Sequence, residues 1–150
     1  LMLAAALSAP ACATQSAMPL PPAPIAAVAP EEVVDAFHAA LKAGNRAAAL
    51  ALLADDVLIL EGGGAERSKA EYAAHHLDAD AAFTKAVPNV QTKRTVATGA
   101  DFAWVATEGQ TKGEFRGRAI DKVSAETMVL KRAGTGWTIA HIHWSSADPH

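Results

Sequence analysis

The segment GWTIAHIHWS, residues 136–145, decides the fold together with the alternating segment Ala119–Arg132 that precedes it. Both segments place apolar or β-branched residues at every second position, and Ala133–Gly136 supplies the glycines of a turn. This pattern predicts an antiparallel β-hairpin. With a four-residue loop, one face of the hairpin carries the pairs Arg132/Trp137, Leu130/Ile139, Met128/His141, Glu126/His143 and Ser124/Ser145.

The two faces of this predicted hairpin differ in chemistry. The first is apolar near the turn and polar at its far end, which is typical of a pocket with a polar mouth, and we expect Trp137, Met128 and Ile139 to line it. The opposite face carries Ile142 and Trp144, which need cover. We therefore expect a homodimer through that face, since burying one large aromatic side chain stabilises by roughly 2 kcal/mol.

The remaining segments predict helices followed by strands. Three helices are expected, from Pro30 to Leu41, from Arg46 to Leu53, and from a cap at Ser68 toward Phe83, with a strand at Val57–Leu60 between the last two. Strands at Val90–Thr98 and Phe102–Thr111 then join the hairpin in a four-strand meander. The predicted class is α+β, with three N-terminal helices packed on a strongly curved antiparallel sheet that encloses a pocket.

The polar end of the hairpin is the first candidate site. His141 and His143 share a face in every register because their spacing is two, whereas a one-residue slip would separate Glu126 from His143. Three interpretations stay open. His143 is a catalytic base that Glu126 orients, with His141 near the reacting oxygen; the three side chains bind a divalent transition metal; or they close the sheet end without catalysis.

A second candidate group lies on the third predicted helix. Tyr72, His76 and Asp80 are spaced four apart and share one stripe, on which Asp80 can accept a hydrogen bond from His76. We expect this stripe to contribute to ligand binding, and if it faces the sheet, His76 joins His141, His143 and Glu126 as a metal ligand. Asp35 and His38 on the first helix are weaker candidates, expected to face solvent.

Composition excludes several classes of function. The 13 Lys and Arg residues, against 16 Asp and Glu, are scattered from Lys42 to Arg132, which disfavours nucleic-acid binding. The single cysteine, Cys12, cannot form an internal disulfide, and it disfavours a cysteine-based zinc site because it lies far from every histidine in the sequence. After Val34 no apolar run reaches the roughly 18 residues of a membrane span.

The first thirty residues are predicted to lie outside the folded domain. Residues 1–13 are typical of the end of a signal peptide, with cleavage after Ala13 or Ala11, and lipidation of Cys12 is the alternative. Residues 14–30 are a linker rich in proline and alanine, and residues 31–150 form the domain. We therefore expect a periplasmic or secreted protein.

Three segments carry a resemblance to a known superfamily: AWVAT at residues 103–107, ETMVL at 126–130 and the closing GWTIAHIHWS. They resemble nuclear transport factor 2-like proteins, most closely the SnoaL-like and ketosteroid-isomerase-like small domains, over about Pro30–Asp148. The resemblance implies a cone-shaped α+β fold, usually a homodimer through the outer sheet face, with a hydrophobic pocket.

Known members include isomerases, polyketide cyclases and dehydratases as well as domains that only bind or assemble. We therefore expect either cofactor-independent acid/base chemistry on a small apolar carbonyl compound, or a non-catalytic ligand-binding or dimerisation domain, with the metal site as a further alternative. The resemblance does not extend to steroid isomerisation, because Tyr72 is the only tyrosine and the acids of the meander are not paired as in those enzymes.

Overall fold

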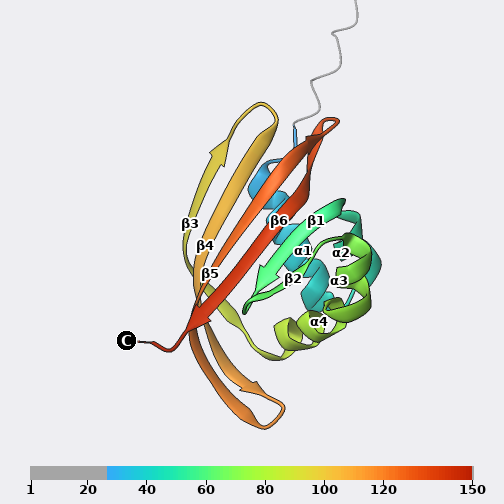
Figure 1. Cartoon of the computed structure of the whole chain (residues 1–150). Coiled ribbons are helices and arrows are strands. Elements are labelled where there is room, and N and C mark those ends of the chain that lie inside the picture. Colours follow the sequence, from blue (N-terminus) through green and yellow to red (C-terminus); the bar gives the residue numbers. More distant parts are fainter. Residues whose placement is uncertain (1–26, 150) are drawn as a thin grey trace, which may run out of the picture.

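The computed structural model describes residues 27–149, so the predicted signal peptide and most of the predicted linker lie outside the described residues. Helices come first and a long meander last, as Figure 1 shows. In chain order the elements are α1 (Pro30–Ala43), α2 (Arg46–Ala51), β1 (Leu53–Glu61), β2 (Gly64–Glu66), α3 (Lys69–His75), α4 (Leu77–Ala86), β3 (Asn89–Thr98), β4 (Phe102–Phe115), β5 (Arg118–Ala133) and β6 (Gly136–Ala147).

Helix α1 forms as the sequence predicts. Pro30 occupies its first turn, where a missing N–H costs nothing, and Glu31 and Glu32 place negative charge at the positive end of the helix dipole. Gly44 ends the helix in the left-handed conformation, at φ 68°, which glycine adopts without steric cost. The buried face includes Val34 and Phe37, both 0 % exposed, and it packs α1 against the sheet.

The third predicted helix is two helices, which corrects the sequence-based expectation. The chain bends at His76, the cap residue between the end of α3 and the start of α4. In one straight helix the Cα atoms of Tyr72 and Asp80 would lie roughly 12 Å apart along the axis. The bend instead lets the Tyr72 hydroxyl donate a hydrogen bond to Asp80 at 2.8 Å.

The six strands form one curved sheet in the order β2-β1-β6-β5-β4-β3. The predicted meander from β3 to β6 is antiparallel, whereas β1 pairs with β6 in parallel. The short strand β2 is not predicted from the sequence, because it begins at Gly64, the last of three consecutive glycines that indicate only a turn. Figure 1 shows the helices gathered on one side of the sheet.

The register of the last hairpin differs from the prediction beyond the first three pairs. Arg132, Lys131 and Leu130 pair with Trp137, Thr138 and Ile139 as expected. A bulge at Ala140 then makes His141 face Val129, and the pairs that follow are Met128/Ile142, Thr127/His143, Glu126/Trp144, Ala125/Ser145 and Ser124/Ser146. Such an extra residue moves every later side chain to the other face. The predicted Glu126/His143 and Met128/His141 pairs are therefore wrong.

This shift also changes the predicted pocket wall and the predicted dimer face. Met128 and Ile139 are 0 % exposed and Trp137 is 6 % exposed, and all three belong to the hydrophobic core instead of lining a cavity. Ile142, 0 % exposed, lies in the same core, and Trp144 packs against it. Ile142 and Trp144, the residues predicted to bind a second copy, therefore lie on the inner face of the sheet and not on the outer one. Within residues 27–149 no helix combines the length and apolar character needed to cross a bilayer.

Candidate functional site

A cavity of about 490 Å³ lies between helices α1 and α4 and the inner face of β3–β6. Its wall mixes apolar side chains with ionisable ones. The apolar part includes Leu41, Phe83, Val87 and Ile120; the ionisable part comprises Asp35, His38, Lys42, Glu61, Asp80, Arg94, Lys122 and Glu126. The cavity is therefore at the polar end of the hairpin, as predicted, but its walls come mainly from other residues.

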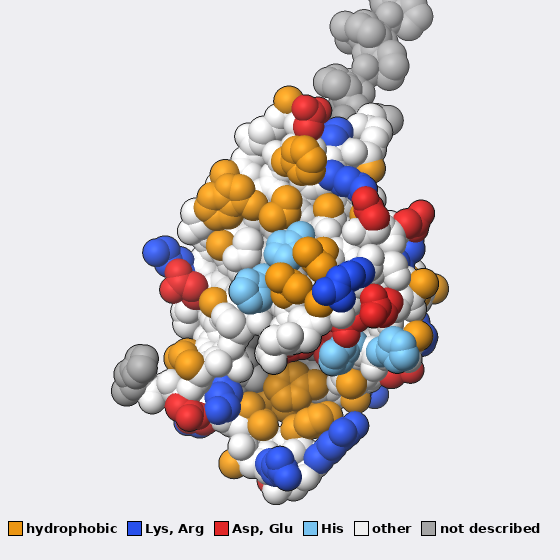
Figure 2. Space-filling view, viewed as in Figure 1, with side chains coloured by type: hydrophobic (Ala, Val, Ile, Leu, Met, Phe, Trp, Pro, Cys, Tyr) orange, Lys and Arg blue, Asp and Glu red, His pale blue; other side chains and the backbone are white. Residues whose placement is uncertain are grey.

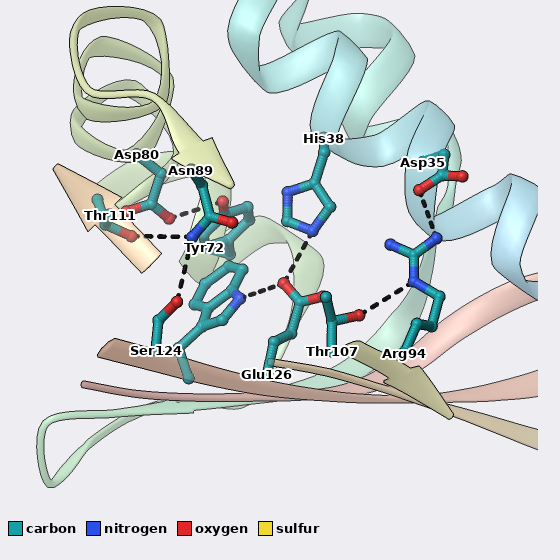
Figure 3. Close-up of polar contacts among 11 residues, drawn as sticks. Asp35, His38, Tyr72, Asp80, Asn89, Arg94, Thr107, Thr111, Ser124 and Glu126 are labelled. Atoms are coloured by element: carbon teal, nitrogen blue, oxygen red, sulfur yellow. Dashed lines mark hydrogen bonds and ion pairs between the residues drawn. The ribbon is translucent and has the colours of Figure 1, made fainter. Parts of the chain in front are cut away.

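A row of four neighbouring side chains crosses the sheet beneath this cavity. Pairing in register places Arg94 of β3 beside Thr107 of β4, Thr107 beside Glu126 of β5, and Glu126 beside Trp144 of β6. Figure 3 shows Arg94, Thr107 and Glu126 on the side of the sheet that faces the helices. Trp144 shares this face because cross-strand neighbours lie on the same side of a sheet. The bulge at Ala140 completes this row, because it brings Trp144 opposite Glu126.

Glu126 is the most buried ionisable side chain of the row, at 10 % exposure. Its Oε2 accepts a hydrogen bond from the indole Nε1 of Trp144 at 2.7 Å. Nε2 of His38, on α1, lies 2.8 Å from the same oxygen. The other oxygen, Oε1, is buried and has no hydrogen-bond partner within the described part of the chain. One edge of the carboxylate is therefore fixed, and the other is left to accept a proton or a hydrogen bond from a ligand.

Two side chains of helix α1, one turn apart, contact the row on the sheet. His38 lies over Glu126, while Asp35 accepts a hydrogen bond from Nη1 of Arg94 at 2.7 Å. Nε of Arg94 also donates to the Thr107 hydroxyl at 3.2 Å. Figure 3 shows the His38–Glu126 and Asp35–Arg94 contacts spanning the space between helix and sheet. The side chain of Asp35 is 62 % exposed, as expected, whereas that of His38 is 38 % exposed and lies against Glu126, so the expectation that it faces solvent is wrong.

Asn89 holds another part of the wall. Its Nδ2 donates to the hydroxyls of Thr111 at 2.8 Å and Ser124 at 3.1 Å, which ties β3 to β4 and β5. Gly109 lies directly beneath it, where an added Cβ would come within 2.6 Å of the Asn89 side chain. Glycine at this position leaves room for the amide to lie across the sheet.

The remaining acidic side chains of the cavity belong to a cluster around Tyr72. The Tyr72 hydroxyl, on a side chain that is 0 % exposed, donates to Oδ2 of Asp80. Burial raises the pKa of Asp80 above its usual value, although the bond from Tyr72 opposes the rise. Burial also raises the pKa of Glu61, with the charge of Asp80 adding to the effect. Both carboxyls thus hold their protons to higher pH than exposed ones do.

The predicted stripe of Tyr72, His76 and Asp80 is only partly formed. His76 pairs through Nδ1 with Glu66, which raises the pKa of His76, and it does not take part in the predicted hydrogen bond to Asp80. Glu66 is 7 % exposed and comes from β2, the strand that the sequence did not indicate. Tyr72 and Asp80 do meet, but through a direct hydrogen bond that depends on the bend between α3 and α4.

His141 and His143 lie on the outer face of the sheet. They are neighbours, with ring centroids 6.5 Å apart, so the prediction that they share a face is confirmed. Glu126 lies on the inner face, and His76 is paired with Glu66, so the predicted four-residue metal set does not converge. Within residues 27–149, no three His, Cys, Asp or Glu side chains are grouped as a metal ion requires.

The functional residue that sequence reasoning underrated most is His38. It follows Phe37 and lies four residues after Val34 and three before Leu41, all three of which are buried. That spacing places it at the edge of the buried stripe of α1. Arg94 was harder to predict as a site residue, because β3 is exposed along nearly its whole length and its buried and exposed positions do not alternate.

Comparisons with known proteins agree with this architecture. Residues 31–149 match the model of the SnoaL-like domain. A crystal structure from Shewanella frigidimarina NCIMB 400, provisionally named a ketosteroid isomerase, is 41 % identical with a TM-score of 0.73, covering 76 % of this chain and 92 % of that chain. No curated protein matches the sequence.

Two more distant structures support the fold alone. A provisionally named dehydratase of the NTF2-like family from Streptomyces avermitilis is 17 % identical with a TM-score of 0.65, over 78 % of this chain and 93 % of that one. An NTF2-like protein with a cystatin-like fold from Novosphingobium aromaticivorans is 18 % identical with a TM-score of 0.63, over 79 % and 80 %. By its sequence match over residues 31–149 and its six-stranded α+β fold, the chain belongs to the SnoaL-like domain family, within the NTF2-like fold.

Proposed function

We propose that the cavity carries out cofactor-independent acid/base catalysis of the isomerase or lyase type on a small carbonyl compound, with Glu126 as the base. The observation that carries this proposal is the buried Oε1 of Glu126, which has no partner in the described residues while Oε2 is fixed by Trp144 and His38. A carboxylate held at one oxygen and unpaired at the other keeps a lone pair on Oε1 with which to accept a proton.

The chemistry needs one proton transfer at carbon and stabilisation at oxygen. Oε1 of Glu126 takes the proton from the carbon next to the carbonyl, the electron pair moves toward the carbonyl oxygen, and Glu126 returns the proton to carbon in an isomerisation. Asp80 lines the same cavity, and burial raises its pKa. We propose that it donates a hydrogen bond to the enolate oxygen in its protonated form. The Tyr72 hydroxyl holds the other oxygen of Asp80 in place.

The provisional names of the Shewanella isomerase and the Streptomyces dehydratase support a reaction of this class for the fold. The predicted base, His143, has no such geometry, because it lies on the outer face away from Glu126 and the cavity. We therefore propose Glu126 as the base in place of His143, with His38 as the imidazole next to it. The size and apolar walls of the cavity suit a small, largely apolar ligand.

Proton abstraction can be measured without knowing the natural substrate. Cyclohexanone and cyclohex-2-enone are incubated with the protein in D₂O, and loss of the signal of the protons next to the carbonyl is followed by ¹H NMR. The wild-type protein is expected to accelerate this exchange above buffer. Glu126→Gln preserves size but removes the base, so we expect the exchange rate to fall by roughly 10²–10⁴-fold.

His143→Gln is the matched control, because it makes a similar change to an exposed side chain on the other face of the sheet. It should leave the exchange rate unchanged. Equal loss in both variants, or full exchange in Glu126→Gln, would contradict the assignment. If neither ketone exchanges its protons but both bind in the cavity and so raise the melting temperature of the protein, the result supports the alternative of a non-catalytic binding domain.

We also propose that the protein is exported, from the residues of its N-terminal segment. Intact mass measurement of protein recovered from the periplasm or medium tests this directly. A mature chain that begins at Thr14 or Cys12 supports cleavage after Ala13 or Ala11, and a Cys12 carrying lipid supports the anchored alternative. Protein that keeps residues 1–13 after expression in a bacterial host would contradict export.

A further inference from the structure

One end of the cavity has no part in the proposed proton transfer. There the inner face of the sheet carries Asn89, Thr111, Ser124 and Lys122, one or two inward-facing positions along the strands from the row that contains Glu126. Ser124 and Glu126 are two residues apart on β5, which corresponds to about 7 Å. Figure 2, viewed as Figure 1 is, shows hydrophobic side chains in a hollow beside α4, with Lys and Arg side chains at its edge.

Two hydroxyl groups at this end keep protons that are available to a ligand. Nδ2 of Asn89 donates to Oγ1 of Thr111 at 2.8 Å and to Oγ of Ser124 at 3.1 Å, as Figure 3 shows. Both hydroxyl oxygens therefore accept, and each hydroxyl still has its own proton to donate. Neither hydroxyl donates to a residue within 27–149. Thr111 is only 7 % exposed, and a buried donor of this kind requires an acceptor.

The spacing of the two hydroxyls fits a carboxylate. The two hydrogens of an amide nitrogen diverge by about 120°, so acceptors of Asn89 Nδ2 at the observed distances lie roughly 5 Å apart. From this separation each hydroxyl can donate to one oxygen of the same carboxylate. Hydrogen bonds from hydroxyl groups to a carboxylate are short and strong.

Lys122 adds positive charge beside these hydroxyls. It is the cross-strand neighbour of Thr111 and lines the cavity. Its Nζ donates to Asp148 at 2.6 Å, and the side chain of Asp148 is 85 % exposed. An ammonium group has three hydrogens, so two remain for a ligand. This end of the cavity therefore offers two hydroxyl protons and a cation, a set of donors that suits an anionic oxygen group.

We propose that Thr111, Ser124 and Lys122 bind a carboxylate of the substrate, so that the cavity takes a small keto acid. This substrate class rests on the proposed function, in which Glu126 takes a proton from the carbon next to the keto group. The carbon chain between the two groups lies against the apolar wall formed by Phe83, Val87 and Ile120. A carboxylate leaves water only where donors replace its hydration, and this end supplies them.

The test compares a keto acid with a neutral ketone of the same shape. The full chain, labelled with ¹⁵N, is titrated with 4-oxopentanoate and with 5-methylhexan-2-one, in which an isopropyl group replaces the carboxylate. Dissociation constants are obtained from the shifts of backbone amide signals at pH 7. We expect 4-oxopentanoate to bind at least tenfold more tightly, because hydrogen bonds to a charged group carry its affinity.

Ser124→Ala and Thr111→Val each remove one hydroxyl. Each should weaken binding of 4-oxopentanoate about tenfold and leave the affinity for 5-methylhexan-2-one unchanged, which shows that the cavity is intact. Lys122→Gln should weaken binding of the keto acid and reduce its dependence on salt. Thr98→Val is the matched control, because this exposed threonine of β3 does not line the cavity, and both affinities should stay as in wild type.

Two results would overturn the carboxylate site. One is 4-oxopentanoate binding no more tightly than 5-methylhexan-2-one, and the other is an equal loss of both ligands in Ser124→Ala and Thr111→Val. Proton exchange in D₂O separates this site from the proposed catalysis. Preferential binding of 4-oxopentanoate without exchange of its protons supports the carboxylate site and contradicts Glu126 as the base. Exchange of cyclohexanone without any preference for the keto acid supports the base and overturns the carboxylate site.

Discussion

Replacing Trp144 by phenylalanine tests how the buried carboxylate of Glu126 is stabilised. The indole Nε1 donates to Oε2 at 2.7 Å, and the Glu126 side chain is only 10 % exposed. A hydrogen bond to a charged group contributes roughly 1.5–3 kcal/mol. Trp144→Phe leaves His38 as the sole polar contact of the carboxylate within the described residues, so we expect the free energy of unfolding to fall by about 2 kcal/mol.

Urea unfolding in EDTA, followed by far-ultraviolet circular dichroism, measures this change. With a slope of roughly 1.5 kcal/mol per molar urea, the midpoint should fall by about 1.3 M. The control is Trp104→Phe, the same ring change at a side chain that is 41 % exposed on the outer face, where we expect a change within about 0.5 kcal/mol.

A double-mutant cycle separates the hydrogen bond from packing. In a Glu126→Leu background the indole has no carboxylate to donate to, so the same Trp144→Phe change should cost much less. If the cost is undiminished there, or if Trp104→Phe is equally destabilising, the reasoning about the buried carboxylate is refuted.

Three further changes have expected outcomes. Asp80→Asn keeps an acceptor for the Tyr72 hydroxyl. Because the folded pKa of Asp80 is raised, its contribution to stability is lost as pH rises through that pKa. Thermal melts should therefore show the variant more stable than wild type near pH 7, with the difference shrinking toward acid pH. Glu66 raises the pKa of His76, so the stability from this pair is fully present below the unfolded pKa of about 6.5 and is lost as pH rises through the folded pKa. In the same melts, His76→Gln should be less stable than wild type near pH 5.5. The difference between the two should disappear at higher pH. Phe37→Ala removes a fully buried ring, and urea unfolding should show a loss of about 3–5 kcal/mol; a loss below 1 kcal/mol would contradict its place in the core.

The local elements follow from local patterns. The caps and apolar spacing of α1 and the alternation and turns of β4–β6 predict these elements to within a few residues, because each signal is contained in the segment that folds. The first three pairs of the last hairpin were predictable for the same reason, since loop length sets register next to a turn.

The bulge at Ala140 was not predictable in this way. Alanine carries no bulge signal such as a left-handed glycine, and the irregularity lies where β6 also pairs in parallel with β1, a strand some eighty residues earlier. That single extra residue decides which of Trp144 and His143 faces Glu126. For this reason the sequence indicates Glu126 as a site residue but pairs it with His143, whereas its contacts in the structure are Trp144 and His38.

The sequence by itself determined the α+β class, the meander, the family resemblance and the presence of chemically capable residues near the polar end of the hairpin, because these depend on periodicity and composition within contiguous segments. Only the tertiary structure decided that His38 from α1 meets Glu126, that Tyr72 reaches Asp80 across a helix bend, and that His141 and His143 turn outward. Those contacts join segments far apart in the chain or depend on one bulge or bend, and their geometry is set by the packing of the whole domain.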